Sequence, residues 1–209
     1  MTILALVAVG LVACTTPGGE IKPVYDAASG ELSQLVYDAN RDGRPDTWSY
    51  TAGSRIVRIE LDTNHDGTVD RWEYYDNMGK LEKIGLSGAR DAIVDTWMYP
   101  NPDGSIARID QSTRRDGRVS RMEFYTGGLV VRAEEDTDAD SRIDKWETYQ
   151  GPTLATVAYD TTRQGKPDRR FFYKADGSLD HVEDGDGKRL PLEEASAPLK
   201  RPSVRPPQQ

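Results

Sequence analysis

Residues 62–73 read DTNHDGTVDRWE, and this stretch predicts both a tight turn and a cation site. Side chains that carry oxygen stand at alternate positions before Gly67, which permits the positive φ that such a turn requires. Calcium takes about six to eight oxygen ligands, and this spacing can supply them. The expected ligands are the side chains of Asp62, Asn64 and Asp66, the backbone carbonyl of Thr68, Asp70 acting through a water, and both carboxylate oxygens of Glu73.

The segments on either side of this loop favour strands. Residues 56–61 (IVRIEL) and 72–75 (WEYY) are rich in β-branched and aromatic residues. The loop itself, D-x-N-x-D-G-x5-E, resembles the calcium loop of EF-hand proteins, and that resemblance implies calcium ligation by the residues named above. An EF-hand places its loop between two helices, so we expect here a calcium loop held between strands.

The same loop recurs along the chain at intervals of 24 or 25 residues. Its glycine position is occupied by Gly43, Gly67, Ala92, Gly117, Ser141 and Gly165, and its tryptophan position by Trp48, Trp72, Trp97, Met122 and Trp146. Aliphatic pairs three residues apart precede most loops, as in Ile56 and Ile59 or Leu81 and Ile84. The sequence therefore predicts an all-β fold, an antiparallel meander of about six hairpin repeats that forms a single curved sheet of roughly a dozen strands, with the Asp-rich loops along one edge.

Residues 72–81 follow the rhythm W-x-Y-Y-x-x-x-G-x-L. This rhythm is similar to the hairpin repeats of the MORN-variant type found in bacterial surface and toxin-immunity proteins, and the similarity covers most of residues 24–183. It implies a single curved sheet and a scaffold role in binding a protein or a surface. The Asp-rich loop is not part of that pattern.

The six loops differ in how many ligands they keep. The loop at 136–147 keeps an acid at every acidic ligand position, although Ser141 replaces the glycine at a cost of roughly 1 kcal/mol if its φ is positive. The loop at 38–49 ends in Ser49 and should bind more weakly. The expected ligands of these two loops are Asp136, Asp138, Asp140, the carbonyl of Arg142, Asp144 and Glu147, and then Asp38, Asn40, Asp42 and Asp46.

The loops that begin at Ser87, Ser112 and Asp160 have lost ligands and should keep the turn without the ion. Arg114 stands at a ligand position of the second of these, where its guanidinium can replace the charge of calcium by a fork to neighbouring carboxylates. Asn and Asp also cap their own backbone in ordinary turns, so plain turns remain the alternative for every loop.

Composition limits the classes of partner. The chain has 209 residues, 30% of them charged, and a net charge of −8. This balance disfavours nucleic acid, whose phosphates require Lys and Arg, and equally disfavours simple electrostatic docking on anionic lipid. Cys14 is the single cysteine, so no internal disulfide can form.

Residues 1–13 are almost wholly apolar but shorter than the roughly 20 residues that span a bilayer, which fits a secretory signal. The segment LVAC at 11–14 resembles the bacterial lipobox, which implies lipidation of Cys14, a membrane anchor and, with Thr15 next, the outer membrane. No Lys or Arg precedes the apolar run, which departs from that pattern, and a buried strand with a chance cysteine is the alternative. We expect a signal peptide at 1–13, a lipidated cysteine and linker at 14–23, the repeat domain at 24–192 and a disordered Pro-rich tail at 193–209.

The sequence does not predict an enzyme. His65 and His181 have no catalytic partner at a recognisable spacing, no Gly-rich phosphate loop is present, and acids that recur every repeat are not a distinct catalytic pair. The tryptophan ladder is interpreted as the core face of the sheet, with a sugar or peptide platform as the alternative. The sequence thus favours a non-enzymatic envelope lipoprotein with structural calcium. The alternative is a metal-free β-repeat adhesin or immunity-type binding protein.

Overall fold

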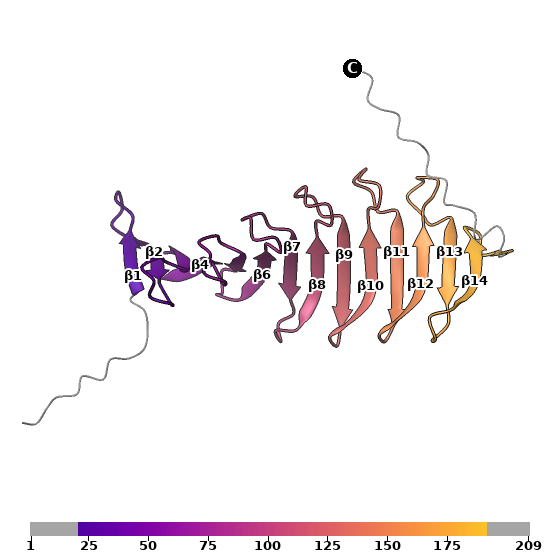
Figure 1. Cartoon of the computed structure of the whole chain (residues 1–209), viewed down its shortest axis with the longest axis horizontal. Coiled ribbons are helices and arrows are strands. Elements are labelled where there is room, and N and C mark those ends of the chain that lie inside the picture. Colours follow the sequence, from indigo (N-terminus) through magenta and orange to yellow (C-terminus); the bar gives the residue numbers. More distant parts are fainter. Residues whose placement is uncertain (1–20, 192–209) are drawn as a thin grey trace, which may run out of the picture.

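The computed structural model describes residues 21–191, and within them the protein is all-β (Figure 1). Its strands are β1 (Ile21–Tyr25), β2 (Leu32–Tyr37), β3 (Thr47–Ala52), β4 (Arg55–Leu61), β5 (Arg71–Tyr75), β6 (Leu81–Leu86), β7 (Thr96–Pro100), β8 (Ile106–Gln111), β9 (Arg121–Thr126), β10 (Leu129–Glu135), β11 (Lys145–Gln150), β12 (Thr153–Tyr159), β13 (Arg169–Tyr173), β14 (Leu179–Asp184) and β15 (Arg189–Leu190). No helix that could cross a membrane occurs in this part of the chain. The expected signal peptide, Cys14 and the Pro-rich tail at 193–209 lie outside the described residues.

The strands form one open sheet in the order β1 to β15, and each strand pairs antiparallel with its neighbours in sequence. This confirms the predicted meander of hairpin repeats. Figure 1 shows β7–β14 side by side in the plane of view, while β4 and β6 are foreshortened, as expected from the right-handed twist of strands. The first strand differs from expectation, because β1 begins at Ile21 inside the segment assigned to the linker. Pro23 is tolerated there because β1 is an edge strand.

Two kinds of connection alternate along the sheet. Short glycine turns close the hairpins β1–β2, β3–β4 and so on, and the Asp-rich loops join each hairpin to the next along the opposite edge (Figure 1). Gly67 has φ +92°, as predicted, and Ser141 at the equivalent position has φ +70°, so the serine does adopt the conformation that costs it stability.

A β-bulge recurs in all seven hairpins and explains the aliphatic pairs spaced by three. In the β5–β6 hairpin, Tyr74 pairs with Lys83 and Tyr75 with Leu81, so Glu82 is the extra residue. Alternation alone would place Leu81 and Ile84 on opposite faces of a strand. The bulge shifts the alternation by one residue and puts both side chains on the same face.

The pairing register assigns the side chains to two faces. We call one the aliphatic face; its central row runs across the sheet through Leu35, Ser49, Ile59, Glu73, Ile84, Met98, Ile109, Glu123, Ala133, Glu147, Val157, Phe171 and Val182. Ala133, Val157 and Val182 in this row are the most deeply buried apolar side chains, with 1%, 5% and 0% exposure. The core is therefore made within one layer, by side chains of adjacent strands that cover one another.

The opposite face, which we call the aromatic face, carries Trp72 and Tyr74 together, as their spacing predicts. Basic side chains of the neighbouring strands cover its rings. Arg58 lies over Tyr50, Lys83 over both Tyr74 and Trp97, Arg108 over Tyr99, and Arg132 over Phe124. Of the predicted tryptophan ladder, Trp97 is covered in this way and Trp72 is buried at 9% exposure, so these two rings do not present a free stacking platform.

Candidate cation-binding loops

The acid at the first position of each intact loop organises the turn. The backbone N–H groups of Asp66 and Gly67 donate to the two oxygens of Asp62, at 3.2 and 2.7 Å. In the fifth loop, the backbone N–H groups of Ala139, one position earlier in the loop than Asp66, and of Ser141 donate to the two oxygens of Asp136, at 2.8 and 3.0 Å. Both aspartates are almost fully buried at 3% and 4% exposure. A buried carboxylate that accepts several backbone N–H groups is satisfied without a metal, so this position is explained by turn chemistry alone.

The third and fifth positions bring further oxygens to the same side of the loop. The amide of Asn64 donates to Asp66 at 3.0 Å, and the backbone N–H of Thr68 donates to the other oxygen of Asp66 at 2.9 Å. These hydrogen bonds, with that from Asn64 the larger influence, hold the pKa of Asp66 below its ordinary value. Asp66 is therefore an exposed anion at neutral pH.

The fifth loop gives the closest grouping of carboxylates. Within residues 21–191, Asp136, Asp138 and Asp140 are the trio whose potential ligand atoms all lie within 4.8 Å of one another. Asp136 is buried, Asp138 is half-buried and Asp140 is exposed, so the trio opens to solvent at one end. Three carboxylates at this separation repel one another unless cations lie between or beside them. The structure therefore confirms that this group could hold a metal ion.

Arginines from the neighbouring loops supply part of the positive charge that offsets the repulsion among Asp136, Asp138 and Asp140. Arg114 donates to the carbonyl of Asp136 at 2.8 Å and to its carboxylate at 3.2 Å. Arg163 donates to Asp138 at 2.5 Å from the other side. From the sequence we expected Arg114 to replace calcium within its own degenerate loop. In the structure it donates to Asp136 of the next loop. A cation that enters the trio must share or displace these two guanidinium groups.

The acids at the ninth position hold the start of each loop. Asp70 accepts hydrogen bonds from the backbone N–H and hydroxyl of Thr63, at 3.1 and 2.8 Å. Asp144 does the same for Thr137, at 2.9 and 2.8 Å. In the first loop, Asp46 accepts from the backbone N–H of Ala39 at 2.8 Å. We expected these three acids to ligate calcium. In the structure, each accepts a hydrogen bond from the backbone at the start of its loop and so joins the two ends of the loop.

The two closing glutamates also differ from expectation, because both lie within strands and are already bonded. Glu73 accepts from the guanidinium of Arg71 and from the hydroxyl of Tyr75, at 2.8 and 2.5 Å. Glu147 accepts from Arg121, Lys145 and Tyr149, at 2.7, 2.6 and 2.8 Å. Neither is grouped with its loop carboxylates as a bidentate ligand would be. A strand follows the ninth position directly, and it turns the twelfth residue onto the aliphatic face instead of into the loop.

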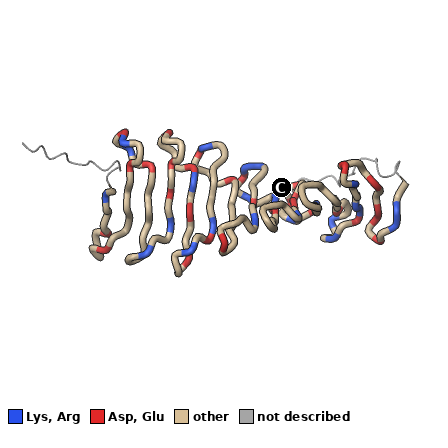
Figure 2. Tube along the Cα trace, turned by 90° about the horizontal axis from the view of Figure 1, so that it is seen from below, with Lys and Arg blue, Asp and Glu red and all other residues tan. Residues whose placement is uncertain are grey.

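A basic residue at the fourth position links neighbouring loops, and we did not foresee it from the sequence. Arg115 reaches Asp91 of the preceding loop at 2.7 Å, and the His65 ring lies 3.3 Å from Asp46. The signal was present, because this position is Arg41, His65, Arg90, Arg115 and Arg163 in five of the six loops, all with φ between 56° and 62°. Figure 2 shows Lys and Arg (blue) interspersed with Asp and Glu (red) along the loops and strands. The loop edge is thus a network of alternating charges.

His181 has partners that the sequence did not indicate. Its ring nitrogens lie 2.7 Å from Asp180 and 3.2 Å from Glu183, and the ring stacks on Phe172 with centroids 4.4 Å apart. No Ser or Cys nucleophile takes part in this cluster. These contacts hold the His181 ring on the aromatic face of the β13–β14 hairpin.

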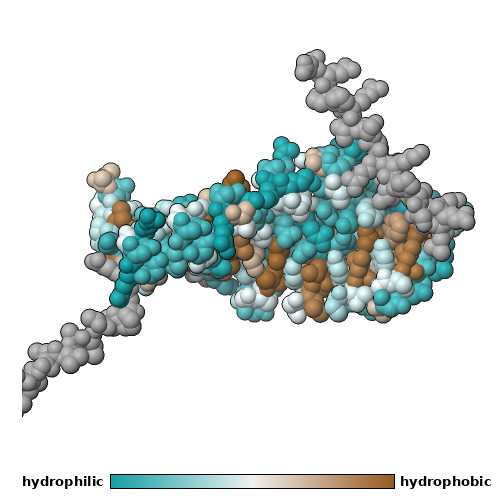
Figure 3. All heavy atoms as spheres, in the orientation of Figure 1, coloured by the Kyte–Doolittle hydropathy of each residue, from teal (hydrophilic) through white to brown (hydrophobic). Residues whose placement is uncertain are grey.

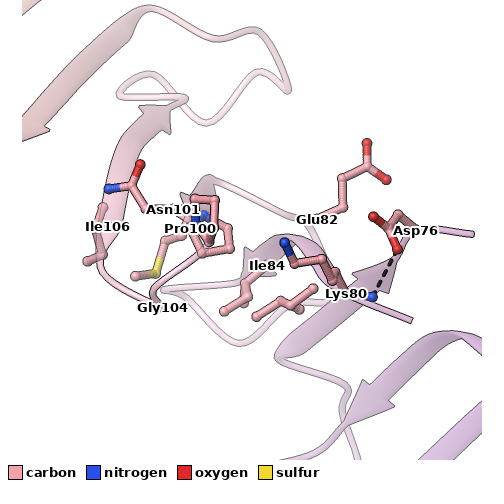
Figure 4. A pocket seen from close by; sticks show the side chains of 11 residues that line it. Asp76, Lys80, Glu82, Ile84, Pro100, Asn101, Gly104 and Ile106 are labelled. Carbon is pink, nitrogen blue, oxygen red and sulfur yellow. Dashed lines mark hydrogen bonds between the residues drawn. The ribbon is translucent and has the colours of Figure 1, made fainter. Parts of the chain in front are cut away.

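A groove lies on the aliphatic face at the other edge, where β6, β7 and β8 meet their hairpin turns (Figure 4). Its volume is about 470 Å³. The floor is apolar, and the rim carries charged and polar groups of the turns. The floor is made by Leu81, Ile84, Met98, Pro100 and Ile106, and the rim by Asp76, Lys80, Glu82 and Asn101.

Comparison with known proteins identifies no family. No protein-family model matches this chain, and no curated protein matches it significantly. Among solved structures, the chain is similar to part of the crystal structure of accessory secretory protein 1, 2 and 3 in Streptococcus pneumoniae, with a TM-score of 0.26 and 13% sequence identity. The match covers 67% of this chain and 19% of that chain. A similarity this low transfers neither fold nor function.

Proposed function

We propose that this chain is a non-enzymatic lipoprotein of the bacterial cell envelope, in which a β-repeat sheet carries structural calcium in its Asp-rich loops. The grouping of Asp136, Asp138 and Asp140 within 4.8 Å is the observation that supports the metal most directly. The loop at Asp62 has the same turn geometry, and the loop at Asp38 follows as a weaker site. An extended sheet with two accessible faces and the similarity to MORN-variant repeats support a scaffold that binds a protein or surface ligand.

The donor set fits calcium, because carboxylate and carbonyl oxygens are the ligands that this ion prefers. The trio and the carbonyl of Arg142 supply fewer protein oxygens than the about six to eight that calcium takes. Glu147 is bound by Arg121, Lys145 and Tyr149, so water would have to fill the remaining positions. This predicts weak binding, with a dissociation constant on the order of 10⁻⁴ to 10⁻³ M, the range of extracellular calcium modules.

A metal-free repeat scaffold is the second candidate, and the arginine contacts favour it. Arg114 and Arg163 already pair with Asp136 and Asp138, at 3.2 and 2.5 Å. If these pairs fully replace the ion, the loops are plain turns stabilised by charge pairs between repeats. The two candidates differ in whether the free energy of unfolding depends on calcium.

Calcium should raise the melting temperature of the full chain, and the effect should depend on two loops. At a calcium concentration tenfold above the dissociation constant, each filled site adds about 1.4 kcal/mol to the free energy of unfolding. Two sites should raise the melting temperature by roughly 5–10 °C, since 1 kcal/mol is worth about 2–4 °C in a chain of this size. Replacing Asp66 and Asp140 together with alanine should abolish most of this gain in thermal melts with excess calcium or chelator.

Asp116→Ala is the matched control. Asp116 stands at the same position of a degenerate loop and accepts the equivalent backbone hydrogen bond, from Arg118 at 3.0 Å, against 2.9 Å between Arg142 and Asp140. The control variant therefore loses the same turn contact but should keep the calcium-dependent gain. Equal melting temperatures of the unmodified chain with calcium and with chelator would instead establish the metal-free scaffold.

The anchor is tested at Cys14, which lies outside the described residues. Cys14→Ala should leave the chain without lipid, so that its mass lacks the acyl groups and the protein leaves the membrane fraction. Cys14→Ser is a second variant that preserves the size of the side chain and should behave in the same way. Membrane fractionation and mass that do not change in either variant would refute the lipoprotein assignment.

A further inference from the structure

The aliphatic face carries a continuous apolar band over β7–β14. Toward the hairpin-turn edge, aliphatic residues of the even strands alternate with tyrosines of the odd strands, and the register aligns them in a row. Figure 3 shows apolar bands (brown) that run along the strands of this half of the sheet, below the hydrophilic loop edge. The row consists of Ile106, Tyr125, Val130, Tyr149, Leu154, Tyr173 and Leu179.

Residues 21–191 provide no second layer to cover this band. All their strands belong to one sheet and pair only with their neighbours in sequence. An apolar sheet face in a folded domain normally packs against another layer. Leu179, which pairs with Tyr173 in the band, remains 38% exposed. The band thus has the character of an interface whose other half is another molecule.

The carboxylates at the centre of this face are paired with cations within the chain. Glu123 and Glu147 both accept hydrogen bonds from Arg121, at 2.9 and 2.7 Å, and each is also bonded by a tyrosine two residues further on. An occupant therefore needs no net charge of its own to match the band. A nucleic acid or an anionic lipid surface would require an excess of positive charge, which this face lacks, whereas a second apolar protein face with paired charges does not.

The aliphatic face over β7–β14, whose hairpin-turn side carries the band, has the size of a dimer interface. Strands lie about 4.8 Å apart and rise about 3.3 Å per residue, so eight strands of five to seven residues cover roughly 700 Å² of flat area. A stable protein interface buries about 800 Å² on each partner. We propose that a second copy of this chain packs its own aliphatic face against this one over β7–β14. Two sheets would then lie about 10 Å apart, with the two bands as the shared core of a β-sandwich.

The test is the mass in solution of the full chain carrying Cys14→Ala, which prevents lipidation, measured by sedimentation over a range of concentrations in calcium-containing buffer. We expect a dimer of copies of 23.3 kDa each. Leu154→Lys with Leu179→Lys places two charges inside the proposed interface, and the dissociation constant of the dimer should rise at least about tenfold. Far-UV circular dichroism should show the same β spectrum in the variant.

Met78→Lys with Ile93→Lys is the control of equal charge. These apolar residues are 85% and 50% exposed and lie in a hairpin turn and an Asp-rich loop, away from the band. The control should remain dimeric. A monomer in the unsubstituted chain at all concentrations would overturn the proposal, and so would a dimer that Leu154→Lys with Leu179→Lys does not weaken. If Met78→Lys with Ile93→Lys weakened the dimer as strongly as Leu154→Lys with Leu179→Lys, the interface would lie elsewhere and the proposal would also fail.

Discussion

Replacing Arg121 with methionine is expected to lower the free energy of unfolding by about 3 kcal/mol and the melting temperature by roughly 6–12 °C. The guanidinium of Arg121 contacts Glu123, Glu135 and Glu147 of three adjacent strands, at 2.9, 3.2 and 2.7 Å. Its side chain is 17% exposed, and the three glutamates are 10–21% exposed. Methionine fills a similar volume but leaves three half-buried carboxylates with Lys145 as the remaining cation, and an uncompensated buried charge is costly.

Arg71→Met is the matched control for this prediction. Arg71 occupies the equivalent position on β5 but contacts Glu73 alone, at 2.7 Å, and its side chain is 34% exposed. The loss there should be about 0.5–1 kcal/mol, the range of solvent-exposed pairs. Urea unfolding of the two variants measures the difference. Equal losses would show that the convergence of three carboxylates on Arg121 adds nothing to stability.

Acid should remove a large part of the stability through Glu147. Burial by itself raises the pKa of this carboxyl, but hydrogen bonds from Arg121, Lys145 and Tyr149 outweigh it and lower the pKa from 4.5 to about 2. A pKa depressed in the folded state means that the unfolded chain binds the proton more tightly. The stability that Glu147 contributes, about 3 kcal/mol, is therefore present above pH 4.5 and is lost progressively as the pH falls to about 2.

The measurement is the free energy of unfolding of the unsubstituted chain and of Glu147→Gln between pH 7 and pH 2. The glutamine keeps the size of the side chain and cannot ionise. The difference between the two proteins should be largest at neutral pH and should shrink as the pH falls below 4.5. A difference that stays constant over this range would show that the charge of Glu147 contributes no stability.

The prediction of the fold succeeded where local signals carried it. Alternation of apolar and polar residues, glycines that must adopt positive φ and the recurrence every 24 or 25 residues together indicated the hairpins, the meander and the position of the Asp-rich loops. The first two signals depend on neighbouring residues and the third on a comparison of successive repeats, so none of them requires the register between strands. Residues 21–23 were expected in the linker but form the start of β1, where Pro23 is tolerated because β1 is an edge strand.

The candidate site was predicted less completely. In the fifth loop, the acids at the first, third and fifth positions meet as their spacing suggested, because one tight turn holds them. The twelfth position does not, because the strand that follows directs Glu147 to the aliphatic face, where Arg121 from 26 residues earlier binds it. Arg114 and Asp136 are likewise 22 residues apart. Such contacts join consecutive repeats and cannot be derived from the chemistry of one loop.

The sequence by itself determined most of the strands, the glycine turns and the tight turn of the Asp-rich loops, because these depend on backbone preferences of residues close together in the chain. Only the tertiary structure decided which face each side chain occupies, because a bulge in every hairpin shifts the alternation by one residue. It also decided which charges meet across the sheet. Whether a carboxylate is paired with an arginine or left for a cation depends on the register between strands, and register is a property of the assembled sheet.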